Sequence, residues 1–260
     1  MTNTVKEELK RSTGLCLKAL GIKPGDAVYL HSDAIVVGQF PGQGNSGGIN
    51  AFLDGIEEYL GEEGTLIVPT FTYSFTKDEI YDVLRTPSTV GLITEVFRNR
   101  PGVSRSPEPI FSVAACGRDK ELYAGCDPHE CMGHGSTFEM LHRNSSWIVG
   151  MGCPFNRATF VHYVEKTLGV SYRYEKVFKG RRILVDGTMQ DWQISYYVRD
   201  LFRRSDIELK RLQAVMTDDG TFRKNPLKRV MTWAARCTDI YDTARTLILQ
   251  KENSLIEEGN

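Results

Sequence analysis

The sequence predicts an α/β fold: a layered sheet flanked by helices, with a mostly helical C-terminal part. Three observations predict it. Short apolar segments alternate with longer segments that have helical periodicity. Glycine, proline and polar residues separate these segments. The length, 260 residues, suits one α/β domain spanning 1–260, with a helical annex expected at about 195–260.

The first part of the chain alternates between the two kinds of segment. Leu9, Leu17 and Leu20 place an apolar stripe on the first helix. Gly61 ends a helix and Pro69 ends an apolar strand. The expected elements are a helix at 3–20, a strand at 27–31, a helix at 49–61, a strand at 64–70 and a helix at 88–102 that Ser88 or Thr89 caps.

The second part continues the alternation. Strands are expected at 110–117, 145–152 and 181–187, with a helix at 157–168 and a mostly helical tail from about 195. In such sheets ligands bind at the carboxyl ends of the strands. The segments that follow the strands at 27–31, 64–70 and 145–152 are therefore expected to border the site.

The composition excludes some classes of partner. Lys and Arg number 32 against 33 Asp and Glu, a net charge of −1, so no nucleic acid partner is expected. The N-terminal segment is polar and no apolar run reaches about 18 residues, so we expect no membrane partner and a cytoplasmic location. Basic residues gather at 179–183 and 203–211, which suits a solvated face or a phosphate-binding surface.

The six cysteines are scattered, and in a cytosolic chain they are expected to be reduced. Cys126, His129, Cys131 and His134 fall within nine residues, and all four types can bind zinc. Structural zinc sites usually draw on two separated ligand pairs, and no second pair follows here. The pattern therefore favours a loop, and no metal is expected.

Gly42, Gly44 and Gly47 match the spacing GxGxxG of dinucleotide-binding loops. The loop starts several residues after its strand, and the next strand ends in "VPT" rather than in an acid that could hold a ribose. This context argues against a dinucleotide. Gly48 stands at the start of a helix, where backbone N–H groups attract phosphate. A plain flexible turn is the alternative.

His162 and Glu165 lie three apart in a segment that otherwise reads as buried helix. On a helix they share one face, close enough to act together. A pair at this spacing is most often a solvated helix face. A catalytic pair is the alternative, and the residues of the helix do not decide between them.

Six segments, in order, resemble the aminoglycoside 3-N-acetyltransferase family, which consists of acyl-CoA-dependent N-acyltransferases. They cover roughly residues 25 to 175 and read "VYLHSDAIVVGQF", "GG" before a helix, "GEEGTLIVPTFTYSF", "TPSTVGLITEVFRNRPGVSRSPEPIFSVAACG", "GHGSTFEMLHRNSSWIVGMG" and "NRATFVHYVEK". Two departures stand out. "LHSDA" replaces the family's "LHSS" segment, and "RSPEPIFS" carries Glu108 and Phe111 where family members commonly have a histidine-containing segment.

The resemblance implies an α/β acyltransferase fold and a reaction between acetyl-CoA, or another short acyl-CoA, and the amine of an amino sugar. It implies His162 and Glu165 as the catalytic pair, with His162 as general base. A homodimer is an open option. The implied coenzyme contacts are Ser32, Asp33, Ala34, Val37, Gly38, Gly48, Ser88, Arg105 and Ser106, and the implied substrate contacts are Tyr73, Asn156 and Thr159.

Three alternatives stay open at this point. Cys153 lies close enough in sequence to His162 for a cysteine acyl-enzyme to be considered. A non-catalytic coenzyme A or sugar-binding module is the second. The third concerns the acceptor. The net charge and the basic clusters favour a nucleotide-linked amino sugar over a polycationic aminoglycoside. An aminoglycoside acceptor would make the protein an antibiotic-resistance enzyme.

Overall fold

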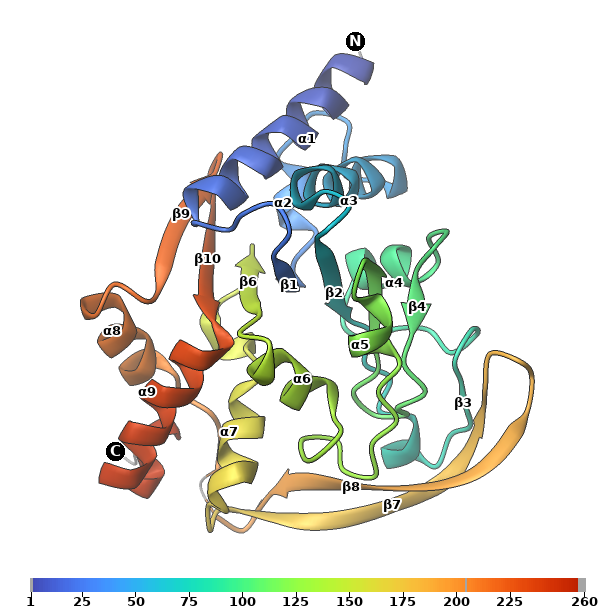
Figure 1. The fold of residues 1–260 in the computed structure, drawn as a ribbon, viewed down its shortest axis with the longest axis vertical. Helices are drawn as coiled ribbons and strands as arrows, with labels where there is room; N and C mark the ends of the chain where they lie inside the picture. The colour runs from blue at the N-terminus through green and yellow to red at the C-terminus, as the bar shows by residue number, and fades with distance from the viewer. Residues whose placement is uncertain (1, 204, 257–260) are drawn as a thin grey trace.

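The computed structural model describes residues 2–203 and 205–256, so the ends of the expected 1–260 domain and Arg204 of the second basic cluster lie outside it. Within these residues a seven-stranded sheet has the order β4-β5-β2-β1-β6-β10-β9 (Figure 1). The centre is parallel: β1 pairs with β2 and with β6, whereas the outer strands run antiparallel. The strands are β1 (Ala27–Ser32), β2 (Thr65–Pro69), β4 (Ser104–Arg105), β5 (Val113–Gly117), β6 (Trp147–Met151), β9 (Arg223–Leu227) and β10 (Val230–Arg236).

Helices cover both faces of this sheet, because its strands alternate apolar side chains to either side. One face packs its Val28 and Leu30 side chains against α1, α3 and α4, and the other packs Tyr29 against the remaining helices. On the first face lie α1 (Thr2–Ala19), α2 (Ile35–Gly38), α3 (Ser46–Leu60) and α4 (Leu92–Arg98). On the second lie α5 (Lys120–Ala124), α6 (Thr137–Arg143), α7 (Val161–Leu168), α8 (Lys210–Asp218) and α9 (Cys237–Gln250).

A long hairpin lies below the sheet in the view of Figure 1. Its strands β7 (Arg173–Ile183) and β8 (Met189–Arg199) pair antiparallel, and the short β3 (Tyr81–Asp82) joins β7 at its far end. The sequence predicted one strand at 181–187 and no hairpin. That prediction was right only for 181–183, which end β7, because 184–188 is the turn between the two strands, where Gly187 has a φ of +84°.

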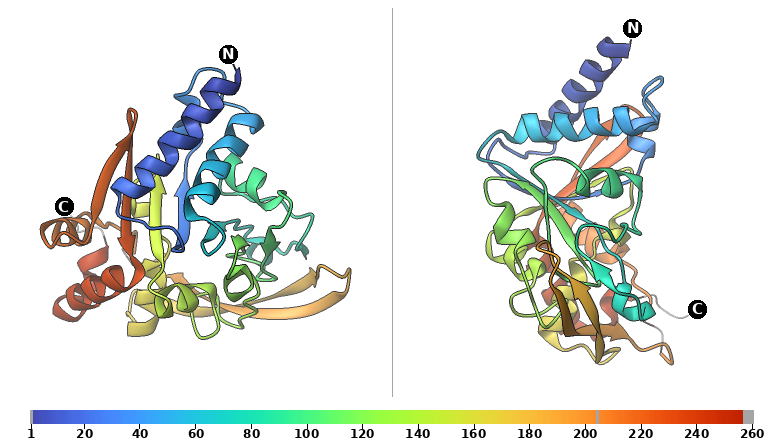
Figure 2. Two further views of the ribbon diagram at one scale, coloured as in Figure 1. Left: turned by 45° about the horizontal axis from the view of Figure 1, so that its top comes forward. Right: turned by 90° about the vertical axis from the view of Figure 1, so that its right-hand side faces the viewer.

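The C-terminal part contains the expected helices, α8 and α9, together with the 3-10 turn η3 (Glu252–Leu255). It also contains β9 and β10, which the sequence analysis missed. β10 pairs with β6, so this part extends the central sheet and is not a helical annex. Figure 2 shows these strands beside the first half of the chain.

The helix expected at 88–102 is shorter, and Gly91 is its N-cap in place of Ser88 or Thr89. Ser88 donates its N–H to Glu95, which reaches back from the first turn, and Thr89 donates its N–H to the carbonyl of Phe71. Both residues are therefore held in the connection that precedes the helix.

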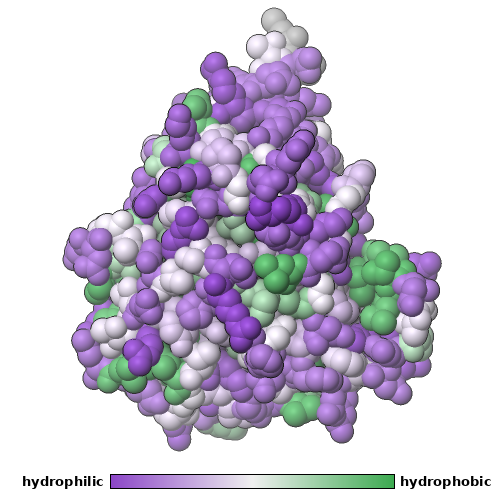
Figure 3. Space-filling view, viewed as in Figure 1, coloured by the Kyte–Doolittle hydropathy of each residue, from purple (hydrophilic) through white to green (hydrophobic). Residues whose placement is uncertain are grey.

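Most of the face in Figure 3 is hydrophilic, with an apolar area at its right edge, near β3 and the hairpin turn. Leu84 and Val185, from these two segments, are more than half exposed. None of the helices in the described part of the chain combines the length and apolar character that a membrane crossing requires.

Candidate active site

The pair His162 and Glu165 lies on α7, which follows the carboxyl end of β6 and the 3-10 turn η2 (Phe155–Arg157). Nδ1 of His162 is 2.7 Å from Oε2 of Glu165. The His162 side chain is 20% exposed and that of Glu165 is 0% exposed. The pair is therefore a contact between a buried carboxylate and a largely buried histidine. The alternative, a pair on a freely solvated helix face, is excluded.

Three groups hold the Glu165 carboxylate. Besides His162, the hydroxyl of Tyr172 donates to Oε1 at 3.0 Å, and Nε of Arg173 forms an ion pair with Oε2 at 2.7 Å. Burial alone raises the pKa of Glu165, but the contacts with His162, Arg173 and Tyr172 outweigh it and hold the pKa below its usual value. Glu165 is thus an ionised carboxylate with a partner at each of its two oxygens.

His162 is neutral near pH 7. Burial lowers its pKa below the usual 6.5 and Arg173 lowers it further, against the opposing effect of Glu165. A carboxylate only accepts hydrogen bonds, so Nδ1 carries the proton that faces Glu165. This leaves the lone pair on Nε2, the state that a general base requires.

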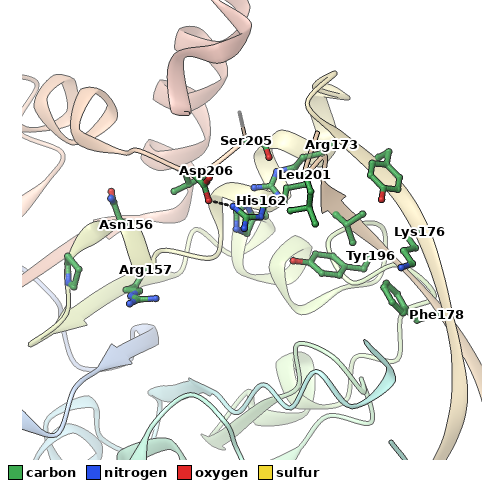
Figure 4. A pocket seen from close by; sticks show the side chains of 15 residues that line it. Asn156, Arg157, His162, Arg173, Lys176, Phe178, Tyr196, Leu201, Ser205 and Asp206 are labelled. Carbon is green, nitrogen blue, oxygen red and sulfur yellow. Dashed lines mark hydrogen bonds and ion pairs between the residues drawn. The ribbon is translucent and has the colours of Figure 1, made fainter. Parts of the chain in front are cut away.

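A cavity of about 720 Å³, here called the hairpin pocket, lies in front of His162. Figure 4 shows His162 near its centre, Asn156 and Arg157 on one side, and Lys176 and Phe178 on the hairpin at the other. The described lining residues are Pro154, Asn156, Arg157, His162, Arg173, Tyr174, Lys176, Phe178, Tyr196, Val198, Arg199, Leu201, Ser205, Asp206 and Ile207.

Positive charge dominates the described lining of the hairpin pocket, with Arg157, Arg173, Lys176 and Arg199 against Asp206. Arg173 pairs with Glu165, and Arg199 pairs with Asp206. Within the described residues, Arg157 and Lys176 have no acidic partner. The pocket therefore presents two uncompensated cations.

A second cavity of about 570 Å³, here called the α2 groove, lies on the other side of Pro154, which lines both. Lys224 and Arg229 supply positive charge, and the rings of Phe222 and Trp233 stack with centroids 5.6 Å apart. The lining residues are Ile35, Gly152, Cys153, Pro154, Phe155, Gln213, Phe222, Lys224, Arg229, Val230, Met231 and Trp233.

The implied coenzyme contacts at 32–38 form the connection from β1 into α2, which borders the α2 groove through Ile35. The Ser32 hydroxyl is buried and has no partner in the described structure. Asp33 accepts the N–H of Ile35, and Ala34 precedes the helix. The Val37 side chain is buried in the core, so only its backbone could serve a ligand, whereas Gly38 has open space beside it.

Arg105 and Ser106 line neither cavity, and both are engaged inside the protein. The Arg105 guanidinium donates to the carbonyls of Thr70, Val83 and Thr86. Ser106 is fully buried, and its hydroxyl accepts the N–H of Val113. Contact with a coenzyme phosphate would require Arg105 to give up these bonds, and its role as a coenzyme contact stays a prediction.

Gly48 and Ser88 are likewise placed away from both cavities. The Gly48 N–H donates to Asn45 Oδ1 at 3.0 Å, which caps α3. A Cβ on Gly48 would lie 1.9 Å from the Gln43 carbonyl oxygen, so the glycine is required for close backbone packing. Ser88 is bonded to Glu95 and Thr94. These groups are not free backbone donors for phosphate.

Of the implied substrate contacts, Asn156 lines the hairpin pocket, with its Oδ1 accepting the N–H of Leu209. Thr159 and Tyr73 are not in its lining. Tyr73 is connected to it through Phe111, whose ring lies 5.4 Å from that of Tyr73 and 4.9 Å from that of Tyr196. Burial raises the pKa of Tyr73 to about 12, so its hydroxyl stays protonated.

Three of the four possible zinc ligands at 126–134 contact other groups. Cys131 donates to the buried Glu108, His129 stacks on Trp192 and His134 pairs with Glu139. The described residues contain no group of three or more potential metal ligands. Burial raises the pKa of Cys153 to about 12, so its thiol is a poor nucleophile.

Several residues of the hairpin and of the connection before it were not predicted from the sequence. Tyr172 and Arg173 hold Glu165, and Tyr174, Lys176 and Phe178 form a pocket wall. The signal was the run "YRYEKVF" (172–178), where aromatic and basic residues recur every second position, as on one face of a strand.

Solved structures share this fold. The chain matches the aminoglycoside acetyltransferase AAC(3)-IVa apoenzyme with a TM-score of 0.78 and 21% identity, over 97% of this chain and 91% of that one. AAC-IIIb, solved as a binary complex with CoASH, matches with a TM-score of 0.78 and 19% identity, over 93% and 96%. These likenesses confirm the predicted α/β fold.

Sequence comparisons agree. A B. subtilis strain 168 protein, the SPbeta prophage-derived aminoglycoside N(3')-acetyltransferase-like protein YokD, is 28% identical over 209 residues, covering 71% of this chain and 74% of its own. Aminoglycoside N(3)-acetyltransferase IV of Salmonella sp is 27% identical over 157 residues, covering 59% and 57%. The aminoglycoside 3-N-acetyltransferase family model matches residues 30–248, and the chain belongs to this family. It is therefore an acyl-CoA-dependent N-acyltransferase that uses acetyl-CoA or another short acyl-CoA as co-substrate, as expected.

Proposed function

We propose that the protein transfers an acetyl or similar short acyl group from acyl-CoA to the amine of a nucleotide-linked amino sugar. The observation that carries the mechanism is the His162–Glu165 contact of 2.7 Å at the wall of the hairpin pocket. Cytoplasmic location and a homodimer stay predictions.

The two cavities suit the two substrates. The α2 groove borders the 32–38 segment and offers Lys224 and Arg229 to the coenzyme phosphates. The hairpin pocket receives the acceptor, with its amine at His162. Because Pro154 lines both cavities, the thioester and the amine can meet beside this residue.

The neutral imidazole performs the proton transfers. The amine nitrogen attacks the thioester carbon, and Nε2 of His162 takes the proton that the nitrogen loses. The C–S bond then breaks, and the imidazolium returns this proton to the departing thiolate. Glu165 stabilises the imidazolium and keeps the ring in the required tautomer.

The charge of the pocket favours an anionic acceptor. Arg157 and Lys176 are uncompensated, and Asp206 is already paired. An aminoglycoside carries several ammonium groups, which carboxylates would bind better.

The second candidate is nevertheless an aminoglycoside, because a relative of similar fold was solved in complex with a gentamicin. We expect a higher kcat/KM for a nucleotide-linked 4-amino sugar than for gentamicin with acetyl-CoA; the reverse order would establish the antibiotic as acceptor.

The decisive variant is His162→Ala. Loss of the general base should lower kcat by about 10²–10⁴-fold, while the Kd for acetyl-CoA stays near that of the wild type. Release of free CoA measures turnover, and calorimetry measures binding. In the wild type, the acid limb of the pH profile of kcat/KM should lie below pH 6.5, because the pKa of His162 is lowered.

Cys153→Ser is the matched control. A buried thiol with a pKa of about 12 takes no part in direct transfer, so this variant should turn over normally. If folded Cys153→Ser is inactive while His162→Ala turns over normally, direct transfer is rejected and a mechanism through an acyl-enzyme is supported.

A further inference from the structure

We infer that the β7–β8 hairpin carries a nucleoside diphosphate subsite, in which Tyr174 stacks on the base and Lys176 binds the diphosphate. The inference rests on the proposed acyl transfer and specifies how its acceptor is held. The site lies within the hairpin pocket, at the end away from Asn156 and Arg157 (Figure 4).

One face of the hairpin forms the subsite. Tyr174, Lys176 and Phe178 alternate along β7 and so point to the same side of the sheet. Val198 and Tyr196 lie opposite Tyr174 and Lys176 on β8, and all five residues line the pocket. A nucleotide laid along this face meets aromatic, cationic and aromatic side chains in turn.

The rings of this face differ in how they are fixed. Tyr196 packs edge-on against Phe111 at 4.9 Å and lies 6.5 Å from Phe178, so these two rings form a wall anchored to the core. Tyr174 is 51% exposed, and no ring contact covers it within the described structure. A flat, exposed phenol ring beside an anchored aromatic wall is suited to stacking of a base.

Lys176 supplies the charge next to this ring. It lies two residues from Tyr174 on the same face, about 7 Å along the strand. Its ammonium lies 4.9 Å from the centroid of the Phe178 ring and has no acidic partner in the described part of the chain. Arg157, the other unpaired cation of the described lining, lies at the far end of the pocket and outside this subsite. Lys176 is therefore the cation that meets the anionic diphosphate.

Coenzyme A also contains a nucleotide, so the two sources must be separated. The α2 groove already offers cations, Lys224 and Arg229, beside the segment that follows β1. The hairpin pocket contains His162, where the acceptor amine must lie. We therefore assign the hairpin face to the nucleotide of the acceptor.

The test measures binding of UDP, dTDP, GDP and CDP by calorimetry, separately from turnover. At least one should bind the wild type. Tyr174→Ala should weaken that binding about tenfold, whereas Tyr174→Phe, which keeps the ring, should stay within about twofold. Lys176→Gln should weaken it about tenfold as well, through loss of a charge-assisted bond.

Lys179→Gln is the matched control for charge. Lys179 is on the same strand but on the opposite face, and it does not line the hairpin pocket. Its removal should leave the Kd of the diphosphate within about twofold of the wild type. All variants should keep the wild-type affinity for acetyl-CoA.

Three outcomes overturn the inference. None of the four diphosphates binds; Lys179→Gln weakens binding as much as Lys176→Gln; or Tyr174→Ala weakens the binding of acetyl-CoA and of adenosine 3′,5′-bisphosphate but not that of any diphosphate. If one of these three outcomes is found while an amino sugar without a nucleotide still causes release of CoA, the proposed acyl transfer is retained and only the subsite is rejected.

Discussion

Glu108 is a buried carboxyl group at the position where the sequence departs from the family's histidine-containing segment. It is 5% exposed, it accepts the N–H groups of Ile110 and Phe111, and the Cys131 thiol donates to it. Burial raises its pKa to about 7, against these opposing hydrogen bonds. Glu108 thus links the loop before β5 to the loop before α6. Its pKa lies close to physiological pH.

Glu108 should make the stability of the protein depend on pH. The folded protein keeps a proton on this group up to a pKa of about 7, whereas the unfolded chain loses it near 4.5. The contribution to the free energy of unfolding is therefore present below pH 4.5 and falls by about 3 kcal/mol as the pH rises through 7. Relative to wild type, Glu108→Gln should gain stability over this range in urea denaturation at several pH values. The exposed Glu62, as Glu62→Gln, is the control; equal slopes for both variants would contradict the assignment.

Some contacts of the candidate site could be predicted from the sequence, and others could not. The spacing of His162 and Glu165 predicts their contact, because both lie on one helix. Tyr172, in the connection beyond that helix, and Arg173, the first residue of β7, also reach Glu165, and a spacing rule for helices does not include such contacts. For Arg105 the family resemblance implied a coenzyme contact, and the sequence did not show that its guanidinium is bonded to loop carbonyls from distant segments.

Among the elements, the contact between β6 and β10 depends on one glycine. Gly150 lies opposite Trp233, and a Cβ at Gly150 would lie 2.1 Å from Cε2 of that ring. The indole N–H in turn donates to the carbonyl of Cys153, in the turn between the two cavities. Packing of the two strands therefore fixes the segment that leads to the site.

Gly150→Ala should lower the free energy of unfolding by about 2–4 kcal/mol, because the packed indole cannot move away without losing its hydrogen bond. Denaturation in urea measures the change. Gly44→Ala is the matched control, since no atom of the described residues lies within 4 Å of its Cβ position, and it should change stability by less than about 0.5 kcal/mol. Equal stability of the two variants would refute the role of Gly150.

The hairpin escaped prediction for a physical reason. Apolar strands such as β2 are buried on both sides and are recognised by composition. β7 reads "RYEKVFKGRRI" and is exposed along most of its length, so its side chains carry charge instead of an apolar alternation. β9 has the same character, with the sequence "RKNPL". Pairing with a partner strand, which the local sequence does not reveal, gives these segments their structure.

For the whole molecule, the α2 groove joins distant parts of the chain. Its walls come from the segment after β1, the turn after β6, α8 and the strands β9 and β10. A ligand in this groove contacts the first and last parts of the described chain together, so its binding energy stabilises the molecule as one unit.

Acetyl-CoA should therefore raise the Tm of a single unfolding transition. At a concentration of 100 times its Kd, the expected gain is about 2.7 kcal/mol, which corresponds to a rise of about 5–10 °C. Differential scanning calorimetry measures the shift, with pantetheine, which lacks the nucleotide, as control. Two transitions, of which only one shifts, would show that the two parts unfold separately.

The pairing of β10 with β6 also has a consequence for the order of synthesis. On the ribosome β6 emerges long before β10, and until then one side of this buried strand has no hydrogen-bonding partner. A nascent chain that pauses in this interval presents an open apolar edge to other nascent chains, which is the usual start of aggregation. Expression of this protein is therefore expected to depend on chaperones that hold the chain until its last strand has been translated.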